Sequence, residues 1–88
     1  MEVEYSKQAL NDLEFWKKNA SPAIKNKITA LISDIQKTPF KGIGKPEALK
    51  GNLSGLWSRR IDDKNRIIYG VTSEYIQVYS LKGHYLDK

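Results

Sequence analysis

The pattern of apolar and polar positions divides the chain into a helical first half and a stranded second half. Residues 2–5 alternate between acidic and apolar side chains, which predicts a short N-terminal strand. Ser6 is a suitable N-cap for a first helix, which we expect to end at Asn19. The predicted core stripe of this helix consists of Leu10, Leu13 and Trp16.

A second helix is predicted directly after the first. Ser21 followed by Pro22 is a start signal, and Thr38-Pro39 is a stop signal. Apolar residues between these signals recur at three- and four-residue spacing, namely Ile24, Ile28, Leu31, Ile32 and Ile35. Because the connection to the first helix is very short, we expect the two helices to form an antiparallel hairpin.

The second half predicts strands that follow a long loop. Residues 39–55 contain two prolines and four glycines and are predicted to form an extended loop, with room for one helical turn at residues 47–50. Strands are predicted at 56–61, 66–71 and 75–81, joined by short polar turns that favour antiparallel pairing. The chain therefore predicts an α+β fold, in which the helix hairpin packs on one face of a mainly antiparallel four-stranded sheet. We expect one domain over residues 1–88.

Composition narrows the function classes. The 88 residues are 40% hydrophobic and 28% charged, with no cysteine and a single histidine. Disulfides, thiol nucleophiles and most zinc sites are therefore excluded, and we expect no metal and no cofactor. No apolar run is long enough for a membrane helix, and the acidic N-terminal segment does not resemble a secretory signal. The expected location is the cytoplasm.

The excess of positive charge lies in the second half of the chain. The formal net charge is +5, and residues 41–88 hold nine basic and five acidic side chains, against six and five in residues 1–40. Such a distribution favours an anionic partner, although solubility alone is an alternative explanation.

Three arginines could form an anion site on the free face of the sheet. Alternation along a strand places Arg59 and Arg60 on opposite faces, and Arg66 begins the next strand, where it can face one of them. Together with lysines of the preceding loop, they would form a positive cleft of phosphate size; these lysines are Lys45 and Lys50. The alternative is that the arginines form surface ion pairs with Asp62 and Asp63.

The chain also holds one set of groups suited to cleavage of RNA without a metal. This reaction needs a base for the 2′-hydroxyl, cations for the crowded phosphate and an acid for the leaving 5′-oxygen. Glu47 could be the base, with the arginines and lysines above as cations and His84 or Tyr85 as the acid. Each of these residues could also have no catalytic role. Glu47 could pair with the loop lysines, and His84 and Tyr85 could be ordinary surface or packing residues.

Two aromatic residues of the strands have two alternative roles. Trp57 and Tyr69 could stack on nucleic-acid bases, but packing in the core is the more common role for such side chains.

The order of these residues resembles the YoeB toxins of the RelE-like superfamily. The resemblance covers the whole chain, and its most specific part comprises Thr38-Pro39-Phe40, residues 42–50, residues 52–61, Arg66-Ile67-Ile68-Tyr69 and the terminal His84-Tyr85. It implies a toxin of a type II toxin–antitoxin system that cuts messenger RNA in the ribosomal A site and leaves a 2′,3′-cyclic phosphate. It also implies the RelE-like fold.

The resemblance assigns roles to individual residues. It implies that Glu47 is the general base, Arg66 the arginine that stabilises the transition state and His84 the general acid, with Tyr85 orienting the substrate. It further implies that Lys50 and Arg60 contact phosphate, which selects Arg60 over its neighbour. Family members commonly end at the histidine–tyrosine pair, whereas this chain continues with Leu86-Asp87-Lys88.

The partners implied by the resemblance are messenger RNA, ribosomal RNA, an antitoxin of the YefM type and a second copy of the toxin. Two other functions stay open at this stage. One is a non-catalytic module that binds nucleic acid, and the other is a gyrase-targeting toxin of the same superfold.

Overall fold

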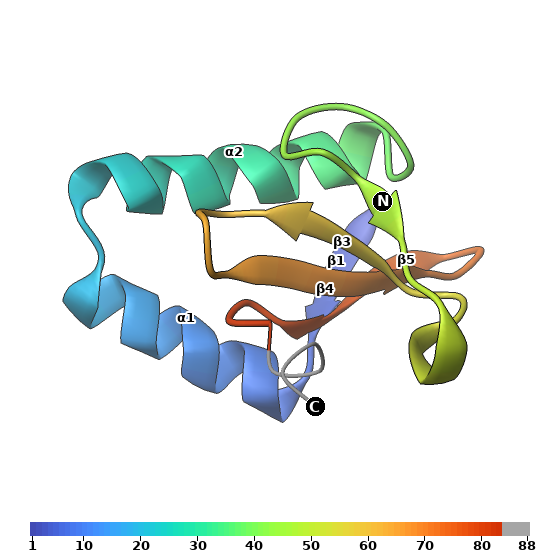
Figure 1. The fold of residues 1–88 in the computed structure, drawn as a ribbon, viewed down its shortest axis with the longest axis horizontal. Coiled ribbons are helices and arrows are strands. Elements are labelled where there is room, and N and C mark those ends of the chain that lie inside the picture. The colour runs from blue at the N-terminus through green and yellow to red at the C-terminus, as the bar shows by residue number, and fades with distance from the viewer. Residues whose placement is uncertain (84–88) are drawn as a thin grey trace.

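In the computed structural model, which describes residues 1–83, five strands form one sheet in the order β1-β5-β4-β3-β2 (Figure 1). The strands are β1 (Glu2–Tyr5), β2 (Glu47–Ala48), β3 (Trp57–Arg60), β4 (Arg66–Val71) and β5 (Tyr75–Ser80). The helices are α1 (Lys7–Asn19), α2 (Pro22–Lys37) and the single 3₁₀ turn η1 (Gly51–Leu53).

The sheet is mainly antiparallel, as predicted. Only β1 and β5 pair in parallel, with Val3 opposite Ile76, and the other three pairs are antiparallel. The expectation of four strands was wrong by one, because the two residues of β2 pair with the first two residues of β3. The predicted helical turn lies later than expected, at η1 instead of residues 47–50.

Both long helices begin at the predicted serine caps. The Ser6 side chain accepts a hydrogen bond from the Ala9 backbone N–H at 3.0 Å, and Ser21 accepts one from Ile24 at 3.2 Å. Each cap satisfies one of the backbone N–H groups that a helix start leaves without an internal partner. The helices run in opposite directions, as expected, but spread into a V from their junction at residues 20–21 (Figure 1).

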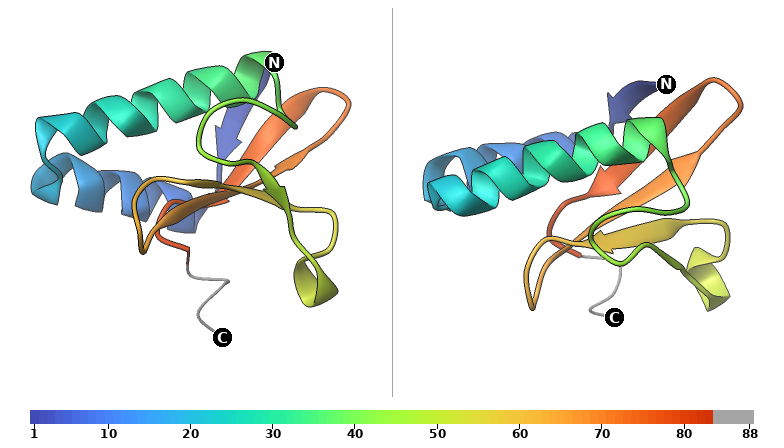
Figure 2. Two further views of the ribbon diagram at one scale, coloured as in Figure 1. Left: turned by 45° about the horizontal axis from the view of Figure 1, so that its top comes forward. Right: turned by 90° about the horizontal axis from the view of Figure 1, so that it is seen from above.

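Both helices lie on the same side of the sheet, and the core fills the space between these two layers (Figure 2). Most of the buried apolar residues come from both helices and from β4 and β5, and they include Leu31, Ile35, Ile67, Tyr69 and Ile76. The opposite face of the sheet carries the remaining residues of each strand, in agreement with the two-residue alternation of strands. Over the described residues 1–83, no helix is long and apolar enough to cross a membrane.

The buried stripe of α1 differs from the predicted one. It contains Ala9, Asp12 and Trp16, whereas Leu10 is 53% exposed and the expectation that it joins the core was wrong. The stripe is rotated because the helix buries a carboxylate: Asp12 is only 2% exposed and accepts hydrogen bonds from the end of β5.

A fully buried arginine holds the loop between α2 and β2. The Arg59 guanidinium donates to Asp34 at 2.5 Å and to three backbone carbonyl oxygens of the loop, those of Thr38, Lys41 and Ile43, at 2.5, 2.9 and 3.0 Å. This corrects the alternative in which Arg59 pairs with the aspartates of the β3–β4 turn. Asp62 instead accepts hydrogen bonds from backbone N–H groups of its own turn. The loop is therefore fixed relative to the sheet edge that it precedes.

Candidate active site

The face of the sheet opposite the helices gathers the predicted site residues that the structure describes. In β3, Trp57 and Arg59 point toward the helices, so Ser58 and Arg60 face the other way. The register places Glu47 of β2 opposite Ser58 and Arg66 of β4 opposite Arg60. Three consecutive strands, β2, β3 and β4, thus contribute to one polar surface.

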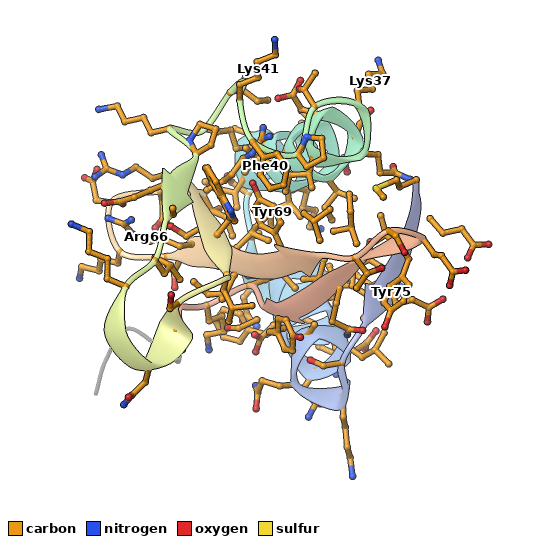
Figure 3. All side chains as sticks on the ribbon, turned by 90° about the vertical axis from the view of Figure 1, so that its right-hand side faces the viewer. Lys37, Phe40, Lys41, Arg66, Tyr69 and Tyr75 are labelled. Carbon is orange, nitrogen blue, oxygen red and sulfur yellow. The ribbon has the colours of Figure 1, made fainter. Side chains whose placement is uncertain are left out.

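Glu47 and Arg66 form an ion pair across β3. The Arg66 Nη1 atom lies 2.9 Å from Glu47 Oε1 and 3.4 Å from the Ser58 hydroxyl. The Glu47 side chain is 62% exposed and that of Arg66 is 32% exposed, so both groups are open to a ligand from solvent. Figure 3 shows Arg66 at the edge of the sheet formed by β2. This pair corrects the alternative in which Arg66 contacts the turn aspartates.

Arg60 and Lys45, two residues predicted to contact phosphate, lie near the Glu47–Arg66 pair. Arg60 is the direct cross-strand neighbour of Arg66, and its backbone N–H donates to the carbonyl oxygen of Gly44 at 2.7 Å. That bond brings the exposed Lys45 beside the arginines, in a left-handed backbone conformation with φ of 52°. An anion above this face would therefore meet two guanidinium groups and a lysine.

Lys50 lies farther along the same segment. It is exposed and precedes η1, so it stands at the other end of β2 from Lys45. The structure thus places Lys45 and Lys50 on opposite sides of Glu47 along the chain, at the open edge of the sheet.

His84 and Tyr85 lie outside the described residues, so their predicted roles stay predictions. The last described residue, Gly83, is buried and lies beside Arg66: a Cβ atom on Gly83 would be 3.7 Å from the backbone nitrogen of Arg66. The last described residue is therefore next to the backbone of Arg66, at the start of β4.

Helix α1 holds the end of β5, directly before this point. The buried Asp12 carboxylate accepts from the Leu81 backbone N–H at 2.9 Å, and the Trp16 indole N–H donates to the Leu81 carbonyl oxygen at 3.0 Å. The Lys82 ammonium lies 3.6 Å from the centre of the Phe15 ring. Our sequence reasoning missed this role of Asp12, although an acidic residue four positions before a predicted core tryptophan is a usable signal.

Tyr69 and Trp57, the two aromatic residues that could stack on bases, differ in their exposure to solvent. Tyr69 is fully buried, donates a hydrogen bond to the Pro39 carbonyl oxygen at 2.6 Å and accepts one from Arg59, so it packs in the core and cannot stack on a base. Trp57 packs partly against the core, and its other neighbour is the exposed ring of Phe40, with 4.9 Å between ring centres.

Hydrogen bonds shift the pKa of Asp34 and burial shifts that of Tyr69, two residues that support the site. The hydrogen bond from Arg59, and then that from the Ile43 N–H, hold the pKa of Asp34 below its usual value. Burial raises the pKa of Tyr69, although the Arg59 guanidinium opposes this shift. Both residues therefore keep the protonation states that the network around Arg59 needs at neutral pH.

Within residues 1–83, no three acidic or histidine side chains come together in a way that could hold a metal ion. The described arrangement offers instead a carboxylate that can accept a proton, beside guanidinium groups that can hold a phosphate.

Comparison with known proteins gives consistent matches over almost the whole chain. Residues 5–85 match the family model described as the YoeB-like toxin of bacterial type II toxin–antitoxin systems. Toxin YoeB of Escherichia coli K12 is 41% identical over 85 residues, which cover 97% of this chain and 100% of that protein. Toxin RelK of Mycobacterium tuberculosis is 43% identical over 83 residues, which cover 94% and 96%.

Solved structures agree with this assignment. A YoeB/ParE toxin from Agrobacterium tumefaciens superposes with a TM-score of 0.86 at 36% identity, covering 93% of this chain and 96% of that one. YoeB in a heterotetrameric YoeB–YefM complex from Staphylococcus aureus has a TM-score of 0.83 at 36% identity, with 93% and 94% covered. The YafQ toxin of E. coli, at 19% identity and a TM-score of 0.79, shares the fold. The chain belongs to the YoeB family of toxins of bacterial type II toxin–antitoxin systems.

Proposed function

We propose that this toxin is a ribosome-dependent endoribonuclease that cuts messenger RNA in the A site by acid–base catalysis without a metal. The observation that carries the proposal is the Glu47–Arg66 pair on the open face of the sheet, with Arg60 beside it. A carboxylate and two guanidinium groups in contact with solvent can act on one phosphodiester.

The chemistry follows from these groups. Glu47 takes the proton of the ribose 2′-hydroxyl, whose oxygen then attacks the adjacent phosphorus. The bond from phosphorus to the 2′-oxygen forms, the bond to the 5′-oxygen breaks, and His84 donates a proton to that leaving oxygen. The products are a 2′,3′-cyclic phosphate and a free 5′-hydroxyl group.

Cations are needed because negative charge accumulates on the phosphate oxygens in the transition state. Arg66 would leave Glu47 and turn to these oxygens when the substrate binds, which is inexpensive because an exposed ion pair contributes at most about 1 kcal/mol. Arg60, Lys45 and Lys50 would hold neighbouring phosphates, and Tyr85 would orient the scissile nucleotide.

The proposal includes the protein partners of the toxin. Relatives of known structure are described as a YoeB dimer and as a YoeB–YefM complex, both from Staphylococcus aureus. We propose that this chain likewise binds an antitoxin of the YefM type and forms a homodimer, in the bacterial cytoplasm where ribosomes are available.

The test is primer-extension mapping of messenger RNA cut by the purified toxin, with and without ribosomes. We expect Glu47→Gln, Arg66→Ala and His84→Ala each to reduce ribosome-dependent cleavage by about 10²- to 10⁴-fold. Glu74→Gln is the matched control, because Glu74 is an exposed carboxylate in the turn before β5. Thermal unfolding should show that the variants stay folded.

Two results would contradict the proposal. One is cleavage at the wild-type rate by all three site variants. The other is RNA binding without cut ends in the wild-type protein, which would favour a module that only binds nucleic acid.

A further inference from the structure

A second positively charged surface lies on the helix side of the sheet, next to β2 but away from Glu47. It is a hollow of about 320 Å³ at the end of α2, lined by Lys37, Thr38, Pro39, Phe40 and Lys41. Figure 3 shows Phe40 at this edge, with Lys37 and Lys41 projecting outward near it. We name these three labelled residues the loop platform.

The aromatic ring of the loop platform is exposed. Phe40 is 53% exposed, and its ring packs at 47° against Trp57, which is itself partly buried in the core. Trp57 thus supports the inner side of the Phe40 ring, and the outer side is open to solvent. An open, supported ring of this kind is suited to stacking on a planar group.

The backbone of the platform is fixed before any partner binds. The carbonyl oxygens of Thr38 and Lys41 accept hydrogen bonds from the buried Arg59, and that of Pro39 accepts one from the buried Tyr69. These bonds lie on both sides of Phe40 along the chain. Because the loop is ordered in advance, a ligand would lose little affinity to the ordering of the protein.

The charge around the ring favours an anionic ligand. Lys37 and Lys41 are exposed and line the same hollow as Phe40. The nearby carboxylate of Asp34 is hydrogen-bonded to Arg59, and its charge interaction with Lys37 is weaker than that hydrogen bond. An aromatic face with two flanking ammonium groups matches a nucleotide, whose base stacks while its phosphates contact cations.

We propose that the loop platform binds one unpaired RNA nucleotide, with its base stacked on Phe40 and its neighbouring phosphates held by Lys37 and Lys41. This inference rests on the proposed function in that it takes RNA as the substrate class. The alternation of Trp57 and Ser58 along β3 puts the platform and the Glu47–Arg66 pair on opposite sides of the β2 edge. An RNA strand that bends around this short edge would touch both.

The test measures binding of fluorescein-labelled single-stranded RNA to the full-length toxin, apart from cleavage. One probe is an octamer of adenylate, and the second is an octamer of abasic ribose phosphates with the same charge. We expect the adenylate probe to bind about 5- to 150-fold more tightly, the range that stacking of one base gives. Phe40→Ala should remove this difference, and Phe40→Trp should keep it.

Matched variants separate the platform from general effects. Leu10→Ala is the control for exposed apolar surface, because Leu10 and Phe40 are both 53% exposed. Lys37→Gln with Lys41→Gln should weaken binding of both probes, and the double change Lys18→Gln with Lys27→Gln, on exposed positions of the helices, should weaken it less. Equal preference for adenylate in the wild type and Phe40→Ala would overturn the proposal.

A competing occupant is an acidic protein segment. If a polyglutamate peptide loses affinity in Phe40→Ala while the adenylate probe does not, the surface binds protein and the proposal is wrong. If adenylate affinity alone is lost, the proposal holds.

Ribosome binding identifies the source of the nucleotide. Weaker binding of Phe40→Ala to ribosomes without messenger RNA would assign the platform to ribosomal RNA, and a loss confined to programmed ribosomes would assign it to the message. Because these measurements need no cleavage, a toxin that binds RNA through Phe40 but does not cut it would refute the proposed nuclease alone.

Discussion

Arg59 is fully buried and makes five hydrogen bonds, to Asp34, to three loop carbonyl oxygens and to the Tyr69 hydroxyl. We expect Arg59→Met to lower the free energy of unfolding by about 3–5 kcal/mol, because the acceptors around it lose their donor. Urea denaturation measures this change. Arg60→Met is the control, since Arg60 is only partly buried on the opposite face, and an equal loss in both variants would contradict the role given to Arg59.

Asp34 gives the network around Arg59 a dependence on pH. Its pKa is lowered in the folded protein, first by the hydrogen bond from Arg59, so its contribution to stability is present above the unfolded pKa of about 3.9 and is lost as pH falls through the folded value. We expect the wild-type free energy of unfolding to drop steeply below about pH 4. Asp34→Asn should remove part of this slope in denaturation curves measured from pH 2 to pH 7.

In the Asp34→Asn variant, Asp62 accounts for pH dependence that remains in the free energy of unfolding. Burial raises the pKa of Asp62, but the N–H groups of Lys64 and Asn65 that donate to it outweigh burial, and the net pKa is lowered. If the free energy of unfolding of Asp34→Asn depends on pH as steeply as that of the wild type, Asp34 does not contribute to the pH dependence of stability.

Which residues interact with one another was the feature that the sequence predicted least well. One alternative from the sequence paired Arg59 with the adjacent turn, but its partner Asp34 lies 25 positions away and is brought close only by the packing of α2 on the sheet. The pairing of Glu47 with Arg66 likewise depends on strand register. Residue types nevertheless singled out Glu47 as a candidate base and Arg66 as a candidate cation before their pairing was known.

At the scale of elements, the loop before β2 depends on a close contact of its backbone. Gly44 has φ of +81°, and a Cβ atom there would lie 2.5 Å from Leu31 Cδ2 and 3.3 Å from the Arg60 carbonyl oxygen. We expect Gly44→Ala to destabilise the protein by about 1–3 kcal/mol, measured by urea denaturation, and to shift Lys45 relative to the site.

The matched control for this change is Gly51→Ala in η1. Gly51 also has a positive φ, +64°, but a Cβ atom would meet nothing within 4 Å. It therefore carries the conformational cost without the clash. If both variants lose the same stability, close packing at Gly44 is not the cause.

The elements themselves were largely predictable, because their signals are local. Serine caps begin α1 and α2 at the predicted residues, and β4 has the predicted bounds. β2 was missed since two exposed residues carry no periodicity, and only pairing with β3 makes them a strand. The stripe of α1 was misjudged at Leu10 because the hydrogen bonds of Asp12 to the end of β5 outweigh the burial of one more leucine.

At the scale of the whole molecule, the net charge of +5 predicts a strong salt dependence of RNA binding. We expect the logarithm of the association constant for single-stranded RNA to fall linearly with the logarithm of salt concentration. Removal of both Lys37 and Lys41 should reduce the slope by about 1.4, at about 0.7 for each phosphate contact. Fluorescence titrations between low and high salt measure the slope, and an unchanged slope would mean that these lysines do not contact phosphate.

The order of strands in the sheet has a consequence for folding during synthesis. Among residues 1–83, β5 is the last strand in chain order, yet it lies inside the sheet between β1 and β4, and it is the one strand of this part of the chain that pairs with β1. The sheet can therefore close only after the residues of β5 have been synthesised, and a nascent chain that ends before Tyr75 holds β1 without a partner strand.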